Sequence, residues 1–241
     1  MSRRFLLICA FALCAVVLTG CDTTRAKNDR AKIATDRVVV GDKGTKVRKA
    51  FSDVRVEQVA LLRSGRRAAI AVLVTSHSDQ TLSDLPIVVG VNSNGKRKQV
   101  NGRARQPYFD SHVPALAAGG STWWVYAPAR RVPHGKPYAI VGAPSFDQRP
   151  GRTIPKVELS RVVSGAHSVK GTVKNSTGFP QYQILLYAVA LKGRAVVAAG
   201  SASNAKFGTG EEQTFQIKLV GRPPKGTAKP TAVPAILAPY R

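Results

Sequence analysis

The residues best suited to chemistry are few and widely separated. All three cysteines lie near the N-terminus, at positions 9, 14 and 21. Because a thiolate is a good nucleophile, a cysteine outside the apolar N-terminal stretch, Cys21, is a candidate for covalent modification. The 13 acidic residues are scattered, and the four histidines, which we expect to be solvated, form no HxH or HExxH spacing. The sequence therefore predicts no catalytic residues, no metal site and no cofactor.

Residues 1–20 have the features of a secretory signal peptide. Arg3 and Arg4 precede an apolar stretch, residues 5–18, which is shorter than the roughly 20 residues that span a bilayer. The sequence then reads Leu18, Thr19, Gly20, Cys21, which resembles the bacterial lipobox. The resemblance implies cleavage before Cys21 and acylation of its thiol, for example with palmitate. The alternative is a plain secretory signal with a chance cysteine.

The same resemblance implies where the protein is found. A lipid-anchored chain would have the cell membrane as a partner and would face the extracytoplasmic side, in the periplasm or at the cell surface. Export conflicts with nucleic acid as a partner. Cys9 and Cys14 would leave with the signal peptide, so the mature chain would have no disulfide and would fold by packing alone.

The charge of the chain is strongly positive. With 37 basic and 13 acidic residues the formal net charge is +24. Such a field attracts anions, so anionic lipid and phosphate-bearing wall polymer are candidate partners. Two basic clusters, residues 63–67 and 96–98, fall in expected hairpin turns, where charge is usually only solvated. Codon bias of a high-GC genome is the alternative source of the charge.

The organisation along the chain changes at about residue 50. Residues 21–49 are basic and poor in apolar residues, which predicts a flexible tether after the lipidated cysteine. Beyond it, alternating apolar residues and frequent Gly, Pro, Asn and Ser predict strands and turns. Landmarks such as Gly65/Gly165 and Gly95/Gly193 recur at an offset of about 100 residues. We therefore predict an all-β chain with two tandem immunoglobulin-like β-sandwich domains, at 50–148 and 149–241, the first lengthened after its middle turn.

The second copy carries a more specific pattern. It consists of Gly171-x-Val173-x-Asn175-x-Thr177, then Leu186-Tyr187, Gly193, Val196-Val197, and Gly210-Glu211 before Phe215. This pattern resembles the FxLYD-type domain of bacterial envelope proteins over residues 157–219. Ala188 stands where that family has an aspartate. The resemblance implies a β-sandwich with a binding or unknown role and brings no catalytic residues.

Candidate binding residues lie in the first copy. Arginine and aromatic residues occur together at Arg103, Arg105, Tyr108 and Phe109, and a second aromatic pair includes Trp123. Neighbouring strand residues point to opposite faces, so one aromatic of each pair is expected outside the core, where it could recognise a partner or cover a sheet edge. The predicted function is a non-catalytic binding or structural role in the envelope, towards anionic components or another envelope protein. The alternative is an accessory or enzymatic protein acting on cell-wall polymers.

Overall fold

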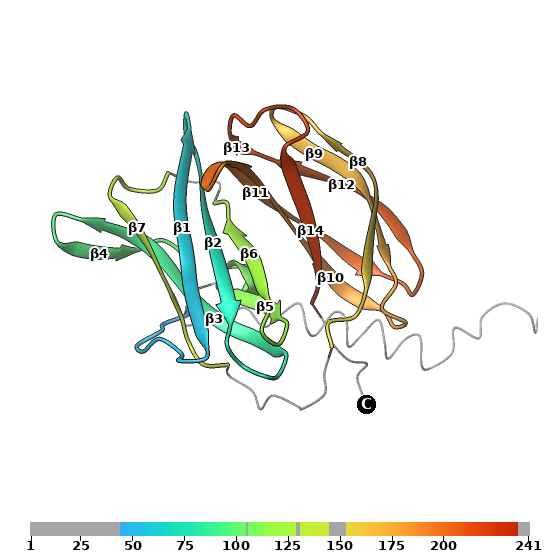
Figure 1. The fold of residues 1–241 in the computed structure, drawn as a ribbon, viewed down its shortest axis with the longest axis horizontal. Helices are drawn as coiled ribbons and strands as arrows, with labels where there is room; N and C mark the ends of the chain where they lie inside the picture. The colour runs from blue at the N-terminus through green and yellow to red at the C-terminus, as the bar shows by residue number, and fades with distance from the viewer. Residues whose placement is uncertain (1–43, 105, 129–130, 145–152, 236–241) are drawn as a thin grey trace, which may run out of the picture. The chain divides into compact units, whose positions relative to one another are not determined.

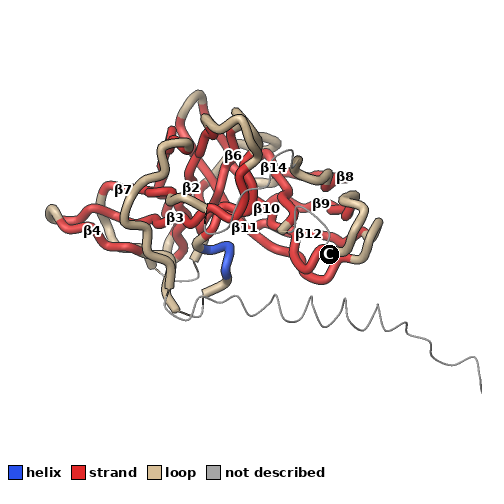
Figure 2. Tube along the Cα trace, turned by 90° about the horizontal axis from the view of Figure 1, so that it is seen from below, coloured by secondary structure: helices blue, strands red, loops and turns tan. Residues whose placement is uncertain are grey.

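The computed structural model describes residues 44–104, 106–128, 131–144 and 153–235. Strands make up nearly all regular structure in these ranges, and the one helical segment they contain is the short 3₁₀ turn η2 (Tyr108–Asp110), as Figure 2 shows. The prediction of an all-β fold is therefore confirmed. None of the described segments forms a helix long and apolar enough to cross a membrane. The predicted signal peptide and most of the predicted tether lie outside the described residues.

Seven antiparallel strands build the first half (Figure 1). One sheet has the order β1-β2-β6 and contains β1 (Val54–Ser64), β2 (Arg67–Ser76) and β6 (Ser121–Tyr126). In the opposing sheet β3 (Leu82–Ser93) pairs with β4 (Lys96–Gln99), β5 (His112–Leu116) and β7 (Lys136–Val141). The Asn94-Gly95 turn between β3 and β4 has positive φ angles of 51° and 72°, which a tight hairpin turn of this kind requires.

The second half repeats this strand order. β8 (Val157–Ser164), β9 (Ser168–Asn175) and β12 (Glu212–Lys218) form a sheet with the order β12-β9-β8. The other sheet has the order β13-β11-β10-β14 and contains β10 (Gln181–Lys192), β11 (Ala195–Phe207), β13 (Val220–Gly221) and β14 (Ala228–Pro234). β8, β9 and β12 thus take the places of β1, β2 and β6, while β14 and β10 take those of β7 and β3. Both halves are sandwiches of one topology.

The first half is longer between β4 and β5. Residues 100–111 there interrupt what is the single strand β11 in the second half. The buried side chain of Asn101 fills the gap beside β3: its Oδ1 accepts a hydrogen bond from the Val89 amide at 2.8 Å, and its Nδ2 donates to the Ile87 carbonyl at 2.8 Å. The same Nδ2 donates to the Asp110 carbonyl at 3.0 Å. One side chain therefore satisfies backbone groups of β3 that have lost a neighbouring strand.

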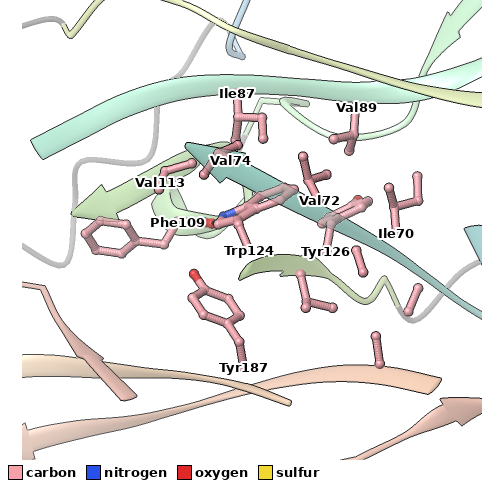
Figure 3. Close-up of a cluster of buried hydrophobic side chains, with 14 of the residues drawn as sticks. Ile70, Val72, Val74, Ile87, Val89, Phe109, Val113, Trp124, Tyr126 and Tyr187 are labelled. Atoms are coloured by element: carbon pink, nitrogen blue, oxygen red, sulfur yellow. The ribbon is translucent and has the colours of Figure 1, made fainter. Parts of the chain in front are cut away.

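Large aromatic side chains fill the core of the first sandwich. Trp124 and Tyr126 are fully buried on β6 and lie beside Ile70, Val72 and Ile87 in Figure 3. Trp124 Nε1 donates to two backbone carbonyls, and the Tyr126 hydroxyl donates to a third at 2.9 Å, so the polar ends of both rings are satisfied. The second sandwich has a smaller core, in which Phe215 and Ile217 alternate with exposed Gln216 and Lys218 along β12.

A third apolar layer joins the two halves, and the described residues all belong to one compact unit. β10 is buried on both faces: Ile184 and Leu186 face the second core, while Leu185 and Tyr187 belong to the cluster of the first half. This contact layer also contains Val189, Ala199, Val220 and Val233 from the second half. The opposing surface is the outer face of β1, β2 and β6, where Gln58 Nε2 donates to the Arg194 carbonyl at 3.0 Å.

Candidate anion-binding surface

The predicted lipidation site falls outside the part of the chain that the structure describes. Leu18, Thr19, Gly20 and Cys21 lie outside the described residues, and so does Arg105 of the predicted binding segment. Lipidation of Cys21 therefore stays a prediction. Residues 44–49, the described end of the predicted tether, contact the first sandwich: the Thr45 amide donates to the Gly102 carbonyl at 3.0 Å.

The aromatic pair Tyr108 and Phe109 lies in η2 and not in a strand, so the expected placement on opposite faces of a strand was wrong. The Tyr108 hydroxyl donates to Asp84 Oδ2 at 2.6 Å, and its ring stacks on His112 with 3.9 Å between centroids. Phe109 is buried and stacks on Tyr182 of the second half at 6.5 Å. Phe109 is thus buried and Tyr108 is half-buried against its neighbours, whereas Arg103 is exposed in the preceding loop. The aromatic side chains of η2 therefore contribute to packing.

The histidine of this cluster also departs from expectation. His112 is buried, whereas we predicted that all four histidines would be solvated; the other three are exposed. Burial lowers the pKa of His112, and its Nδ1 lies 3.0 Å from the Tyr108 carbonyl oxygen. His112 is covered because it pairs with Pro86 of β3 and lies under the Tyr108 ring, and the residue spacing alone does not encode these contacts.

Trp123 and Trp124 follow the predicted alternation along β6. Trp124 is fully buried in the core, and Trp123 is half-buried on the opposite face, packed against the large apolar cluster. That face of β6 meets the second half. Trp123 therefore contributes to the contact layer between the sandwiches, which accounts for an aromatic side chain outside the core.

Many basic side chains lie near one another at the hairpin turns of the first sandwich, where we had expected only solvated charge. The β3–β4 hairpin lies beside the start of β7, because Asn92 pairs with Lys136, and the β1–β2 hairpin reaches the segment before β7. The Arg63 guanidinium donates to the carbonyl oxygens of Val132 and Pro133, which connects the first hairpin to that segment. We call this surface the cationic end; its exposed basic residues are Arg63, Arg66, Arg67, Lys96, Arg97, Lys98, Arg131 and Lys136.

Among the described residues of the first half, acidic side chains are absent from the cationic end and gather towards the opposite end. Asp53 and Glu57 lie at or near the start of β1, Asp79 lies in the turn after β2, and Asp84 lies near the start of β3. Asp110, in η2, is the remaining described acid of this half. Because antiparallel strands place alternate turns at the same end, these acids lie away from the cationic end, in a region where exposed basic residues such as Lys49 and Arg55 also occur.

The second half has the same polarity. Lys192 and Arg194 flank the β10–β11 turn, and the loop before β14 carries Arg222 and Lys225. The Gly226 amide donates to the Ser164 carbonyl at 3.1 Å, so this loop lies against the β8–β9 turn. The described acids of this half lie at the other end, at Glu158, Glu211 and Glu212. Two of them are partly neutralised there by ion pairs, one of 2.8 Å from Lys156 and one of 3.9 Å from Lys174.

No carboxylate pairs with the basic residues of the cationic end among the described residues. Unpaired cations at exposed hairpin tips leave their positive potential available to an anion from solution. No group of three or more His, Cys, Asp or Glu residues that could hold a metal ion occurs among the described residues. The chemistry that this surface supports is reversible binding of anions.

Comparisons with known proteins give no family for this chain. No protein-family model matches it, and no curated protein matches it. Among solved structures, the C-terminal globular domain of an oligosaccharyltransferase from Pyrococcus abyssi shows 10% sequence identity and a TM-score of 0.26. The match covers 76% of this chain and 47% of that chain, so this protein spans less than half of its length. A TM-score this low supports no argument about function.

Proposed function

We propose that this chain is a lipid-anchored protein of the bacterial envelope that binds an anionic envelope component and catalyses no reaction. The observation that carries the proposal is that basic hairpin tips gather at one end of each sandwich, where the described residues include no carboxylate, whereas basic residues at the other end lie among acids and pair with some of them. Codon bias alone would add basic residues but would not keep carboxylates away from the basic hairpin tips. The candidate partners are anionic lipid and phosphate-bearing wall polymer.

Binding at such a surface is electrostatic and therefore sensitive to salt. Contact with several anionic groups releases counterions, so the affinity falls steeply as the salt concentration rises. Screening shortens the reach of each charge to about 8 Å at physiological ionic strength. Only groups that come close to the hairpin tips would then contribute.

A pair of matched triple variants tests this part of the proposal. The first variant removes positive charge from the cationic end by changing three residues to glutamate: Arg63, Arg66 and Arg67. The second variant changes the net charge by the same amount outside the cationic end, at Lys46, Arg48 and Lys49. Co-sedimentation with vesicles containing anionic lipid, across a salt series, measures the binding. We expect the first triple variant to lose binding and the second to keep most of it. Equal losses would show that position does not matter and would contradict the proposal.

The anchor has its own test. Cys21→Ser removes the thiol that would be acylated, so we expect the variant to lose palmitate labelling and to leave the detergent phase. The matched control is Cys14→Ser, which changes a thiol in the predicted signal peptide and should be labelled like the unaltered chain. A Cys21→Ser protein that still incorporates palmitate would contradict the lipobox assignment.

The alternative, an enzyme acting on wall polymers, draws on the cluster of Asp84, Tyr108 and His112. It is the place in the described chain where a histidine and a carboxylate approach the same side chain. His112 is buried and stacked, which favours a structural role. Release of soluble fragments from purified cell wall, abolished by His112→Gln without loss of folding, would support the enzymatic alternative over the binding role.

A further inference from the structure

Three polar side chains form a row across the outer face of the sheet that β4, β3 and β7 make. Asn92 of β3 lies directly opposite Arg97 on β4 and directly opposite Lys136 on β7. Directly opposed residues of antiparallel strands present their side chains on the same face. Neighbouring strands lie about 4.8 Å apart, so the row spans about 10 Å. Arg97 and Lys136 are exposed and Asn92 is half-buried, so the row is open to solvent.

The central glycine of β3 fixes the position of the arginine. Gly90 lies opposite Tyr138, and a Cβ atom at Gly90 would lie 2.8 Å from the Tyr138 ring, so the ring lies across the glycine. The Arg97 guanidinium in turn lies over this ring, 5.4 Å from its centroid. A guanidinium stacked on an aromatic ring is already restrained, so it loses less conformational entropy when it binds an anion.

We propose that Arg97, Asn92 and Lys136 form a subsite for a phosphate group, an inference that rests on the anion-binding function proposed above. The guanidinium offers a planar fork of donors, the ammonium a compact charge, and the amide a further neutral donor between them. A phosphate group has enough acceptor oxygens to use all three donors, whereas a carboxylate has two oxygens in one plane. The phosphate could belong to a lipid headgroup or to a polymer.

Lys98 provides a matched control for this subsite. It follows Arg97 by one residue on β4, is equally exposed and carries the same charge, but its side chain points to the opposite face of the strand. Diffuse attraction to the whole cationic end would depend equally on both residues. A subsite would depend on Arg97 alone.

The experiment measures the binding of long-chain polyphosphate to the full chain by titration calorimetry. We expect Arg97→Ala to weaken binding about tenfold or more, since a hydrogen bond to a charged group is worth about 1.5–3 kcal/mol. Lys98→Ala should weaken it by less than about threefold, as for a solvated charge. Tyr138→Phe should bind like the unaltered chain, and Tyr138→Ala should bind like Arg97→Ala, because only the latter change removes the ring. Thermal melts would verify that each variant folds.

The outcomes separate the subsite from the function on which it rests. If the unaltered chain binds neither polyphosphate nor vesicles containing phosphatidylglycerol, the anion-binding function is wrong. If it binds, but Arg97→Ala and Lys98→Ala weaken binding equally, the function stands and the subsite is wrong. Poly-glutamate serves as the carboxylate probe, and an equal dependence of its binding on Arg97 would overturn the preference for phosphate. Arg97 dependence with polyphosphate but not with the vesicles would identify a polymer as the source, and the reverse a lipid headgroup.

Discussion

The burial of the Asp110 carboxyl leads us to expect that the protein becomes less stable as the pH rises through the mildly acidic range. Burial raises the pKa of this carboxyl from its ordinary value of 3.8 to about 6. The Tyr187 hydroxyl, which faces it from the second half, is buried and has no hydrogen-bond partner among the described residues. In the folded state the carboxyl therefore binds its proton more tightly than in the unfolded chain.

The size of the effect follows from the difference between the two pKa values. Each pH unit of that difference corresponds to about 1.4 kcal/mol, so ionised Asp110 lowers the free energy of unfolding by at most about 3 kcal/mol. The stability that the protonated carboxyl provides is fully present below about pH 4, falls as the pH rises, and is lost above about pH 6. Asn at this position mimics the protonated carboxyl and should remove the dependence.

Urea unfolding of the unaltered chain and of Asp110→Asn, from pH 4.5 to pH 8, tests this reasoning. We expect the variant to be more stable by about 1–3 kcal/mol at pH 8 and by much less at pH 4.5. Asp79→Asn, at an exposed acid in a turn, serves as the control and should show no such trend. A stability difference between Asp110→Asn and the unaltered chain that stays constant across this range would refute the assignment of a raised pKa to Asp110.

Three further predictions concern packing. Asn101→Ala should lower the free energy of unfolding by about 2–4 kcal/mol in urea, because the Val89 amide and the Ile87 carbonyl lose their partner; a loss below about 1 kcal/mol would contradict the role of Asn101. Gly90→Ala should cost about 1–3 kcal/mol and weaken polyphosphate binding, because its Cβ would lie 2.2 Å from the Lys98 carbonyl oxygen and 2.8 Å from the Tyr138 ring; unchanged melting and binding would show that the sheet accommodates a methyl group there. Residues 149–241 alone should give an all-β circular dichroism spectrum yet bind a hydrophobic dye, and residues 50–148 added in trans should reduce the dye signal; a helical spectrum would contradict the predicted second domain, and absence of dye binding would contradict a buried contact layer.

Much of the fold followed from local pattern. Alternating apolar residues predicted strands, as along β12 with Phe215 and Ile217, and the hairpin turn expected at residues 96–98 is the turn between β3 and β4, because both patterns depend only on neighbouring residues. The turn η2 did not follow, since adjacent aromatics read equally well as part of a strand. Its conformation depends on the Asn101 side chain and on contacts with the second half, which are distant in sequence.

The cationic end was within reach of the sequence but was missed. Arg63 and Arg97 lie in different hairpins, and each cluster alone is an ordinary solvated turn. Alternate turns of an antiparallel chain fall at one end, so charges summed over alternate turns would have predicted an end with many basic residues and no described acid. The row of Asn92, Arg97 and Lys136 was beyond prediction, because it requires the pairing of β3 with β7 and the exact register of both pairs.

The alanine-rich outer face of β2 has a consequence for the order in which the chain is made. The N-terminal half leaves the ribosome first, and a domain completed early must wait for its partner. Ala69 and Ala71 are buried only once the whole chain has folded, and they alternate with the larger core residues Ile70 and Val72. At these two positions the waiting surface offers less apolar area to a stray chain than leucine or phenylalanine would, whereas Trp123 on the same face of β6 offers a large ring. The nascent first half therefore exposes its apolar area mainly around Trp123 and least along β2, and this face stays open until the strand that carries Leu185 and Tyr187 has been made.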